Sequence, residues 1–390
     1  MAKTYDIVII GAGIGGLFAA YYAQEHRLGS ILIVEATGVE GGRSTRLSAA
    51  MLTRFAEEPD LAAMTVESVA LYHDSVLEDL PPALDHDKPV PFFHKSGFAI
   101  MGRNRKNADE VRRQVSYLNG LGVGAELVSA SVINEMSEHL FRFQESATFA
   151  ICGDDGWLNI DVVVRQLSQL LIQRSGVDIR PNTRATGIVV DAGGVVGVKL
   201  ADGSKVATRC VVNAAGVCAG VVASWVGSDL AIRASKKNLV NVPLVTRSKR
   251  PRYAQPIVEC LDDAWYFRPH PSGMLVGVGR GHDIEPIERA LRRDPVQVEP
   301  LAIRRTRRYL TKWTTLRRVD KLDLTGWAGY RPISSPGLSA DDRSEMPRFG
   351  HRAGTPLGYV ESCGWGEFGV TLGPLGGKRV AEAIHGGPLP

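Results

Sequence analysis

Three glycines near the amino terminus have the spacing of a turn that holds phosphate groups. Gly11, Gly13 and Gly16 follow an apolar run at residues 7–10 and precede a helical pattern that continues to about Glu25. The first glycine permits a tight strand-to-helix turn, the second lets backbone amides approach a pyrophosphate, and the third allows the helix to pack closely on the strand. The amino terminus of the helix then faces the phosphate charge.

An acidic residue at the end of the next apolar run fits the same chemistry. The run at residues 31–34 ends at Glu35, nineteen residues beyond Gly16. A carboxylate at this place accepts hydrogen bonds from ribose hydroxyls and disfavours a 2′-phosphate. A turn that only joined two elements would leave Glu35 unexplained, so the pattern as a whole predicts dinucleotide binding.

The elements that must position these residues are predicted from hydrophobic periodicity. The runs at residues 7–10 and 31–34 are continuously apolar, as in strands covered on both faces of a parallel sheet, and the helix between them completes a βαβ unit. Further extended patterns occur at residues 90–101, 188–191, 195–200, 205–207, 211–216 and 235–278, the last with the alternation of an antiparallel sheet. Further helical patterns occur at residues 59–80, 107–118, 161–174, 217–226, 301–312 and 374–385.

These patterns predict an α/β fold built from two domains. The first is a discontinuous Rossmann-like domain that binds the dinucleotide, at residues 1–80, 155–233 and 325–390. The second is an α+β substrate-binding domain with a mixed or antiparallel sheet, at residues 81–154 and 234–324.

Composition excludes several classes of protein. With 390 residues, 44% of them hydrophobic and 23% charged, the chain can bury a large core and is neither disordered nor fibrous. A formal net charge of +4 argues against a nucleic-acid-binding protein. The basic clusters at 247–252 and 304–308 are interpreted as solvated faces, with macromolecular contact as the alternative.

Cysteine and histidine usage indicates neither a metal site nor a disulfide framework. The five cysteines form no CxxC pair and the nine histidines form no HExxH pattern, so we expect no bound metal and a reducing, cytoplasmic location. The start of the chain has no secretory h-region, and no apolar run approaches the length of about 18 residues that spans a bilayer. Any membrane contact is expected to be peripheral.

Four segments resemble the FAD-dependent amine and amino-acid oxidoreductases, the D-amino-acid oxidase-like family. They are the small, hydroxyl-rich stretch at 41–51, Asn-Ala-Ala-Gly at 213–216, Trp-Ala-Gly-Tyr-Arg-Pro at 327–332 and the glycine loop at 364–374. The spacing is most similar to that of the D-amino-acid dehydrogenases, including the D-arginine type. The resemblance covers nearly the whole chain and implies that the dinucleotide is FAD.

The turn and the resemblance together imply a set of residues that contact FAD. These are Gly11, Gly13, Ile14, Gly15, Gly16, Glu35, Ala36, Arg43, Ser44, Thr45, Arg46, Ser48, Ala49, Ala50, Ala185, Ala215, Gly216, Gly329, Arg331, Gly366, Glu367, Phe368, Gly369, Val370 and Thr371. Relatives with covalent flavin carry a cysteine just after the arginine motif, whereas here Pro-Ile-Ser-Ser follows at 332–335, so non-covalent FAD is expected.

Two basic residues are candidates for binding a substrate carboxylate. The resemblance gives this role to Arg331, whose guanidinium can bind a carboxylate with two hydrogen bonds and stays charged at any working pH. Its alternative is an ordinary salt bridge. Lys237 stands where relatives carry a second basic group, and a lysine there supplies a point charge; its alternative, like that of Lys236, is a solvated strand edge.

Four further side chains are candidates for the substrate pocket. Tyr266 matches a family tyrosine over the flavin face, with core packing as the alternative. Glu367 stands where relatives tend to have glycine, and its carboxylate either attracts a substrate cation or points to solvent. Met51 and Phe55 would add apolar surface, although such residues are more often in the core.

The resemblance implies oxidation of the C–N bond of a small amino acid, in particular a D-amino acid, to an imino acid. Hydride would pass from the α-carbon to flavin N5 while Arg331 anchors the carboxylate, and the rate would rise with pH as the amine loses its proton. The electron acceptor would be a quinone, a dye-like molecule or O₂. The alternatives are flavin-dependent oxidation of a 2-hydroxy acid or an N-methyl amine, as in sarcosine and glycine oxidases, and a flavoprotein subunit of a larger complex.

Overall fold

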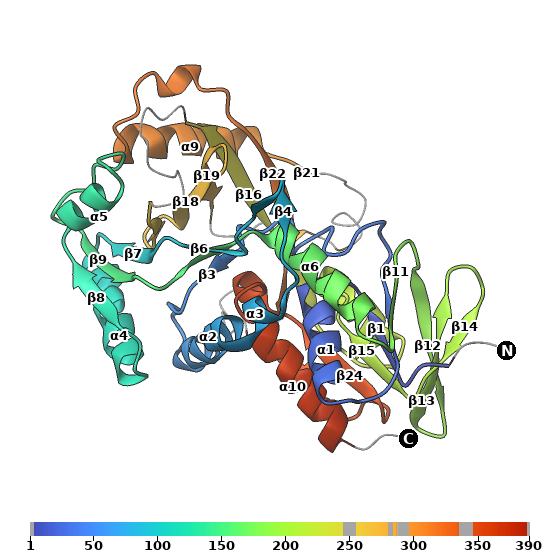
Figure 1. Ribbon diagram of the computed structural model, residues 1–390. Helices are drawn as coiled ribbons and strands as arrows, with labels where there is room; N and C mark the ends of the chain where they lie inside the picture. Colours follow the sequence, from blue (N-terminus) through green and yellow to red (C-terminus); the bar gives the residue numbers. More distant parts are fainter. Residues whose placement is uncertain are drawn as a thin grey trace.

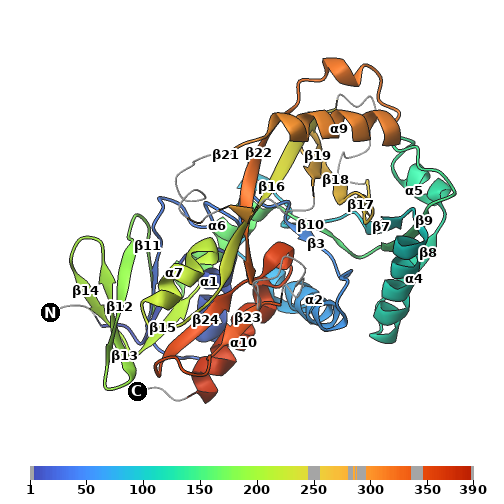
Figure 2. The ribbon, with the colours of Figure 1, turned by 180° about the vertical axis from the view of Figure 1, so that it is seen from behind.

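The computed structural model describes residues 4–244, 255–279, 284–285, 287, 296–334 and 346–387. Two large sheets lie side by side, joined by segments that cross between them several times (Figures 1 and 2). The basic cluster predicted at 247–252 lies outside the described residues. The other cluster lies on helix α9 (Pro300–Trp313), where Arg304, Arg305 and Arg308 are exposed.

The first sheet confirms the predicted parallel core. Its six strands run in the order β11-β2-β1-β15-β24-β23, and all pairs are parallel except the last. The bounds are β1 (Ile7–Ile10), β2 (Ile31–Val34), β11 (Val177–Arg180), β15 (Cys210–Asn213), β23 (Arg348–Gly350) and β24 (Tyr359–Cys363). Ile7 and Ile9 pack into one hydrophobic cluster and Val8 into another, because successive side chains of a strand point to opposite faces. Burial on both faces explains the unbroken apolar runs.

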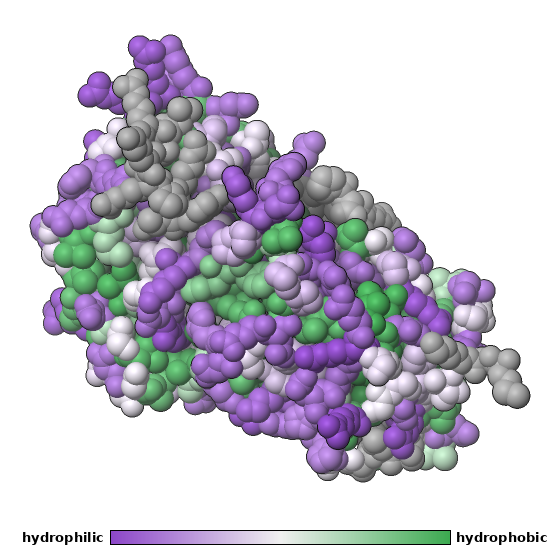
Figure 3. Space-filling model, in the orientation of Figure 1, coloured by the Kyte–Doolittle hydropathy of each residue, from purple (hydrophilic) through white to green (hydrophobic). Residues whose placement is uncertain are grey.

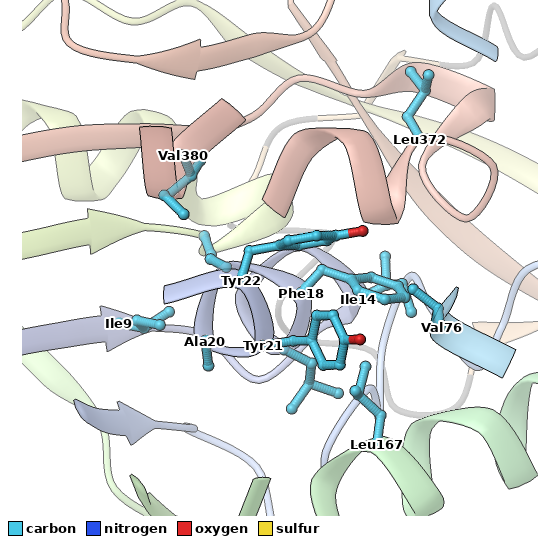
Figure 4. Packing of buried hydrophobic residues seen from close by; sticks show 14 of the residues in the cluster. Ile9, Ile14, Phe18, Ala20, Tyr21, Tyr22, Val76, Leu167, Leu372 and Val380 are labelled. Carbon is cyan, nitrogen blue, oxygen red and sulfur yellow. The ribbon is translucent and has the colours of Figure 1, made fainter. Parts of the chain in front are cut away.

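Helices cover one face of this sheet. They are α1 (Ile14–Glu25), α6 (Ile160–Gln173) and α10 (Gly373–Gly386), with α2 (Pro59–Leu71), the π-helical turn η1 (Tyr72–Val76) and α3 (Leu77–Asp79) alongside. Figure 4 shows Phe18, Tyr21 and Tyr22 of α1 packed with side chains from η1, α6 and α10. The contact of α1 with α10 is close, since a Cβ at Gly377 would lie 2.4 Å from the Phe18 carbonyl oxygen.

The opposite face is covered by smaller elements. They are the antiparallel sheet of β12 (Ala185–Asp191), β13 (Gly194–Leu200) and β14 (Lys205–Ala207), the 3₁₀ turn η2 (Gly216–Cys218) and α7 (Ala219–Ser224). The helix predicted at 217–226 is thus a 3₁₀ turn followed by a short α-helix. These elements pack on the sheet through buried side chains, among them Ile188, Val195 and Val198.

The second sheet has ten strands and is mostly antiparallel. Its order is β21-β22-β16-β19-β18-β17-β7-β9-β8, with β20 paired to β16 and a parallel pair formed by β17 and β7. The bounds are β7 (Phe98–Gly102), β8 (Ala125–Val128), β9 (Thr148–Cys152), β16 (Ile232–Pro243), β17 (Ile257–Cys260), β18 (Trp265–His270), β19 (Gly273–Val278), β20 (Ile284–Glu285), β21 (Val296–Gln297) and β22 (Thr325–Ser334). The predicted two-domain division stays a prediction; β22, assigned there to the dinucleotide domain, lies in this second sheet.

One face of the second sheet is packed with aromatic rings. Trp265 and Phe267 lie with Phe143 and Trp313 in a cluster under α9 and α5 (Ala130–Met136). Part of the opposite face is covered by α4 (Arg105–Gly120). The remaining part of that face is turned toward the first sheet.

Short elements complete the description. They are β3 (Met51–Leu52), β10 (Gly156–Leu158) and β6 (Phe93–Lys95) in one small sheet, β4 (Leu84–Asp85) with β5 (Lys88–Pro89), and the 3₁₀ turns η3 (Val319–Lys321) and η4 (Gly366–Phe368). The surface in Figure 3 is largely hydrophilic, with apolar residues in small areas. Among the helices that the structure describes, none combines the length and hydrophobicity needed to cross a membrane.

Candidate functional site

A continuous pocket extends from the glycine turn after β1 to the face of the second sheet. Nearly all the predicted FAD and substrate residues line it, including those of the turn, the segment at 41–51, the arginine motif and the last glycine loop. Two predicted residues do not line it. Gly16 is packed inside the turn, and the Arg46 side chain is drawn away by an ion pair with Asp161 on α6, with Nε 3.3 Å from Oδ1.

The glycines of the turn have different physical roles. Gly11 has a φ of +108°, and a Cβ there would lie 2.5 Å from the Ala214 carbonyl oxygen. A Cβ at Gly16 would lie 1.9 Å from the Gly11 carbonyl oxygen. Gly13 has φ −73° and ψ 178°, which any residue adopts, and the nearest atom to an added Cβ is Thr45 Oγ1 at 3.4 Å. Neither the backbone conformation nor the packing around residue 13 therefore requires a glycine. Gly13 lines the pocket, so the lack of a side chain leaves space over the amino terminus of α1.

Glu35 is fixed by backbone amides beside this turn. Its Oε2 accepts a hydrogen bond from Ala12 N at 2.9 Å, and Oε1 accepts from Thr37 N at 2.8 Å. A carboxylate has about four acceptor positions, so these contacts orient the group and leave capacity for ribose hydroxyls. Glu35 lines the pocket, and its binding of ribose hydroxyls stays a prediction.

Hydroxyl groups of the segment at 41–51 shape the wall of the pocket. Thr45 Oγ1 accepts from Ile14 N at 3.1 Å, Ser44 Oγ donates to the Tyr330 carbonyl at 2.6 Å, and Ser48 Oγ donates to the Thr45 carbonyl at 2.6 Å. These bonds tie the glycine turn to β22. The predicted turn, the hydroxyl-rich segment and the arginine motif therefore meet in space.

The far end of the pocket is one face of the second sheet. Alternation along the strands places Arg331 of β22, Lys237 and Leu239 of β16, Tyr266 of β18 and Glu259 of β17 on this face. All except Leu239 carry a polar group, and all five line the pocket.

Arg331 is paired with Glu367 at this end. The guanidinium donates from one terminal nitrogen to Glu367 Oε2 at 2.5 Å, and the second terminal nitrogen lies 3.5 Å from Ser235 Oγ. Burial by itself would raise the pKa of Glu367, but the charges of Arg331 and Lys237 and the hydrogen bond from Arg331 together lower that pKa below its ordinary value. Glu367 and Arg331 therefore form an ion pair at this end of the pocket.

Lys237 lies inside the sheet and not at its edge. Strand β16 is paired on both sides, by β22 and β19, which excludes the solvated strand edge that was the alternative. The ammonium donates to the Gly279 carbonyl at 2.7 Å and lies 5.4 Å from the centre of the Tyr266 ring. Burial, with a smaller contribution from the Arg331 charge, lowers the pKa of Lys237 to about 8. Lys236 points to the opposite face, where it pairs with Glu299 at 2.5 Å.

Tyr266 packs in the core and also lines the pocket, and the sequence had allowed either position. Its ring is 5% exposed and packs with Leu239 and Leu275, and it also lines the pocket. The ring lies flat over β19 because Gly277 has no side chain; a Cβ there would come within 2.1 Å of the ring. Met51 and Phe55 line the same region.

Glu259 is a pocket residue that the sequence analysis did not select. Burial, with a further contribution from the Glu367 charge, raises the pKa of Glu259 to about 7. The available signal was a single carboxylate inside the apolar run Ile257-Val258-Glu259-Cys260, a pattern typical of a strand with one polar position. Leu47, Thr53, Arg184, Cys218 and Trp365 are further lining residues that were not predicted.

The lining of the pocket fits a long ligand that carries an anionic group beside the glycine turn. The amino terminus of α1 has no acidic residue in its first turn, and Gly13 lines the pocket, so phosphate groups could approach the amides there. Among the described residues, no group of three histidine, cysteine or acidic side chains is arranged to hold a metal ion.

Comparison with known proteins gives the same family that the motifs suggested. The sequence model of the family described as FAD dependent oxidoreductase (DAO) matches residues 6–383. Sarcosine oxidase subunit beta of Arthrobacter sp is 26% identical over 239 residues, which is 59% of this chain and 56% of that protein. The subunit of the same name from Rhodobacter capsulatus is 22% identical over an alignment of 403 residues, which is 100% of this chain and 86% of that protein.

Two solved structures share the fold. L-proline dehydrogenase from P. horikoshii has a TM-score of 0.80 at 19% identity and covers 98% of this chain and 94% of its own. Glycine oxidase from Bacillus cereus has a TM-score of 0.76 at 20% identity and covers 98% of this chain and 95% of its own.

Proposed function

This chain belongs to the FAD dependent oxidoreductase family, and from that membership we propose that it oxidises the C–N bond of a small amino acid to an imino acid, with Arg331 as the carboxylate anchor. The observation that carries the proposal is the position of Arg331. Its guanidinium lies at the end of the same pocket whose other end is the glycine turn. A D-amino acid is the proposed stereoisomer, on the resemblance to D-amino-acid dehydrogenases.

The residues of the chain would bind and orient the substrate. The substrate carboxylate replaces Glu367 as the acceptor on Arg331, and the Lys237 ammonium adds positive potential beside it. The released Glu367 carboxylate lies close to the α-ammonium, which shares a carbon with the bound carboxylate. Tyr266 and Leu239 form an apolar surface that keeps water from the reacting carbon.

Bound FAD supplies the acceptor for the hydride that leaves the α-carbon. Before that step the substrate ammonium gives one proton to solvent, so that the amine lone pair can form the imine bond. We propose non-covalent FAD, because no cysteine follows Arg331 in the described part of β22. Release of the flavin by acid precipitation of the protein would support this; flavin that stays with the precipitate would contradict it.

A second candidate is oxidation of an N-methyl amino acid. Two relatives are sarcosine oxidase beta subunits, one of which aligns with the whole of this chain. Arg331 would bind the carboxylate of either substrate class equally well. The two classes differ in the amine substituent and in the stereochemistry at the α-carbon, and neither difference changes the carboxylate. The same relatives make a flavoprotein subunit of a larger complex part of this alternative.

The experiment is anaerobic mixing of the purified holoprotein with D-amino acids, L-amino acids and N-methyl amino acids. Loss of flavin absorbance with one stereochemical series supports the first candidate, and loss with sarcosine alone supports the second. If no amino acid bleaches the flavin, the proposed reaction is wrong. Oxygen uptake after substrate addition separates O₂ from a quinone or dye as the acceptor.

The affinity for a simple carboxylate is expected to fall as pH rises through about 7 and about 8. Above the first value Glu259 gains its negative charge, and above the second Lys237 loses its positive charge, so both ionisations make the pocket less favourable for an anion. The measurement is a titration of the holoprotein with caproate, followed by the flavin spectrum across this pH range. Lys237→Met should remove the upper transition and leave the lower one; affinity independent of pH in the unsubstituted protein would contradict both assignments.

A further inference from the structure

We propose that Glu259 binds a positively charged group at the distal end of the substrate side chain, so that the preferred substrates are amino acids with a cationic side chain. The inference rests on the proposed function, because it takes Arg331 as the site of the substrate carboxylate. It names the substrate class of the same pocket.

The positions of Arg331 and Glu259 separate the two ends of the substrate. β22 and β17 are four strand spacings apart in the sheet order β22-β16-β19-β18-β17. At about 4.8 Å for each spacing, their backbones are roughly 19 Å apart. Both side chains reach inward from this distance into one pocket. We therefore place a distal group of the substrate at Glu259, because the strands that carry Arg331 and Glu259 are not neighbours in the sheet.

The surface between these two charges suits an aliphatic stem. Leu239, Gly277, Tyr266 and Glu259 are aligned neighbours across four strands. The Tyr266 ring lies over Gly277 and gives a flat floor, with Leu239 on its Arg331 side. Lys237, the cation nearest this floor, donates to the Gly279 carbonyl.

Glu259 has no direct partner for its charge among the residues that the structure describes. Within the residues that the structure describes, no side chain or amide donates a hydrogen bond to its carboxylate. The charged groups that act on it from neighbouring elements are Glu367, Lys237, Arg331 and Glu57. Glu259 is half-buried in the wall of the pocket, and burial raises the pKa of its carboxyl to about 7. A substrate cation would satisfy this carboxylate.

The α-ammonium is better placed for Glu367. Glu367 lies 2.5 Å from the guanidinium that would hold the carboxylate, and the α-ammonium is attached to the carbon next to that carboxylate. The two acidic residues of the pocket thus correspond to the two cations of a basic amino acid. A substrate with a neutral side chain would use only one of them.

The test uses ligands that cannot be oxidised at an α-carbon. The holoprotein is titrated with γ-aminobutyrate, δ-aminovalerate and ε-aminocaproate, and with butyrate, valerate and caproate, while the flavin spectrum is recorded. Each pair has the same carbon chain and differs in the distal ammonium. We expect at least one amino ligand to bind about tenfold more tightly than its matched acid, as a hydrogen bond between charged groups would give. Equal affinities in all three pairs would overturn the inference.

Two variants locate the effect. Glu259→Gln keeps the shape of the side chain and removes its charge, so the preference for the amino ligand should fall to about one. Glu57→Gln is the matched control, since Glu57 is exposed, lies within electrostatic range of Glu259 and does not line the pocket. The preference should persist in this control. A preference that survives in Glu259→Gln would assign the distal cation to another group.

This design separates failure of the inference from failure of the proposed function. If ligand discrimination depends on Glu259 but no amino acid reduces the flavin, the Glu259 subsite is supported and the proposed reaction is wrong. If amino acids reduce the flavin but ligand discrimination does not depend on Glu259, the proposed reaction is supported and the Glu259 subsite is wrong.

Discussion

Replacement of Arg331 by alanine is expected to lower kcat/KM for an amino-acid substrate by about a hundredfold or more. Hydrogen bonds to charged groups contribute about 1.5–3 kcal/mol each, and two of them at a planar guanidinium correspond to at least that factor. The Arg331 side chain is only 18% exposed, so water replaces these bonds poorly. The measurement is steady-state kinetics with the substrate found by flavin bleaching.

Arg331→Lys is the matched control for this effect. A lysine keeps the positive charge but offers a point charge without the two-pronged geometry, so we expect an intermediate loss that falls mainly on KM. Most of the flavin should remain bound in both variants, because we expect the phosphate contacts at the glycine turn. Unchanged kinetics in Arg331→Ala would show that the carboxylate binds elsewhere.

Replacement of Gly13 by valine is expected to abolish flavin retention while the protein stays folded. Gly13 has a φ of −73° that suits valine, and its nearest neighbour is 3.4 Å from an added Cβ, so the backbone and the Cβ fit the folded protein. The branched side chain would occupy the space in which the pyrophosphate approaches the amides of α1. We expect a loss of at least about a hundredfold in affinity for FAD, because both the close approach and the helix-terminal contacts depend on this space.

The readouts for Gly13→Val are the flavin-to-protein absorbance ratio and far-ultraviolet circular dichroism of the purified protein. Gly124→Val serves as the control, since that exposed glycine also has no close neighbour and lies far from the pocket. Gly16→Val should differ from both: a Cβ there meets the Gly11 carbonyl at 1.9 Å, so loss of flavin would be accompanied by loss of stability. Normal flavin content in Gly13→Val would contradict the placement of the phosphates.

Local sequence was sufficient for the first βαβ unit. The runs at 7–10 and 31–34 are apolar at every position because both faces of the parallel sheet are covered, and this leaves a signature in a few adjacent residues. The glycine turn and Glu35 act through contacts within that unit, such as the bond from Ala12 N to Glu35 Oε2 at 2.9 Å. The positions of Gly11, Gly13 and Glu35 at the pocket could therefore be predicted from spacing.

The substrate end depended on pairing between distant strands. Glu259, Tyr266 and Arg331 share one face only because β17, β18 and β22 belong to one sheet in a particular register. A shift of one residue in any of these strands would turn its side chain to the aromatic face. The residues next to Glu259 in the sequence do not indicate this register.

Ion pairs between residues far apart in the sequence account for the remaining differences between the predicted and the observed site. Arg46 leaves the pocket because Asp161, on a helix more than a hundred residues away, holds its side chain. Arg331 and Glu367 come together from different elements, which assigned Glu367 to the pocket where the sequence had also allowed solvent. The sequence by itself determined the fold class and the dinucleotide turn, since these depend on neighbours in the chain. The tertiary structure alone decided which charges face one another across the substrate pocket, because opposite charges are paired by distance in space.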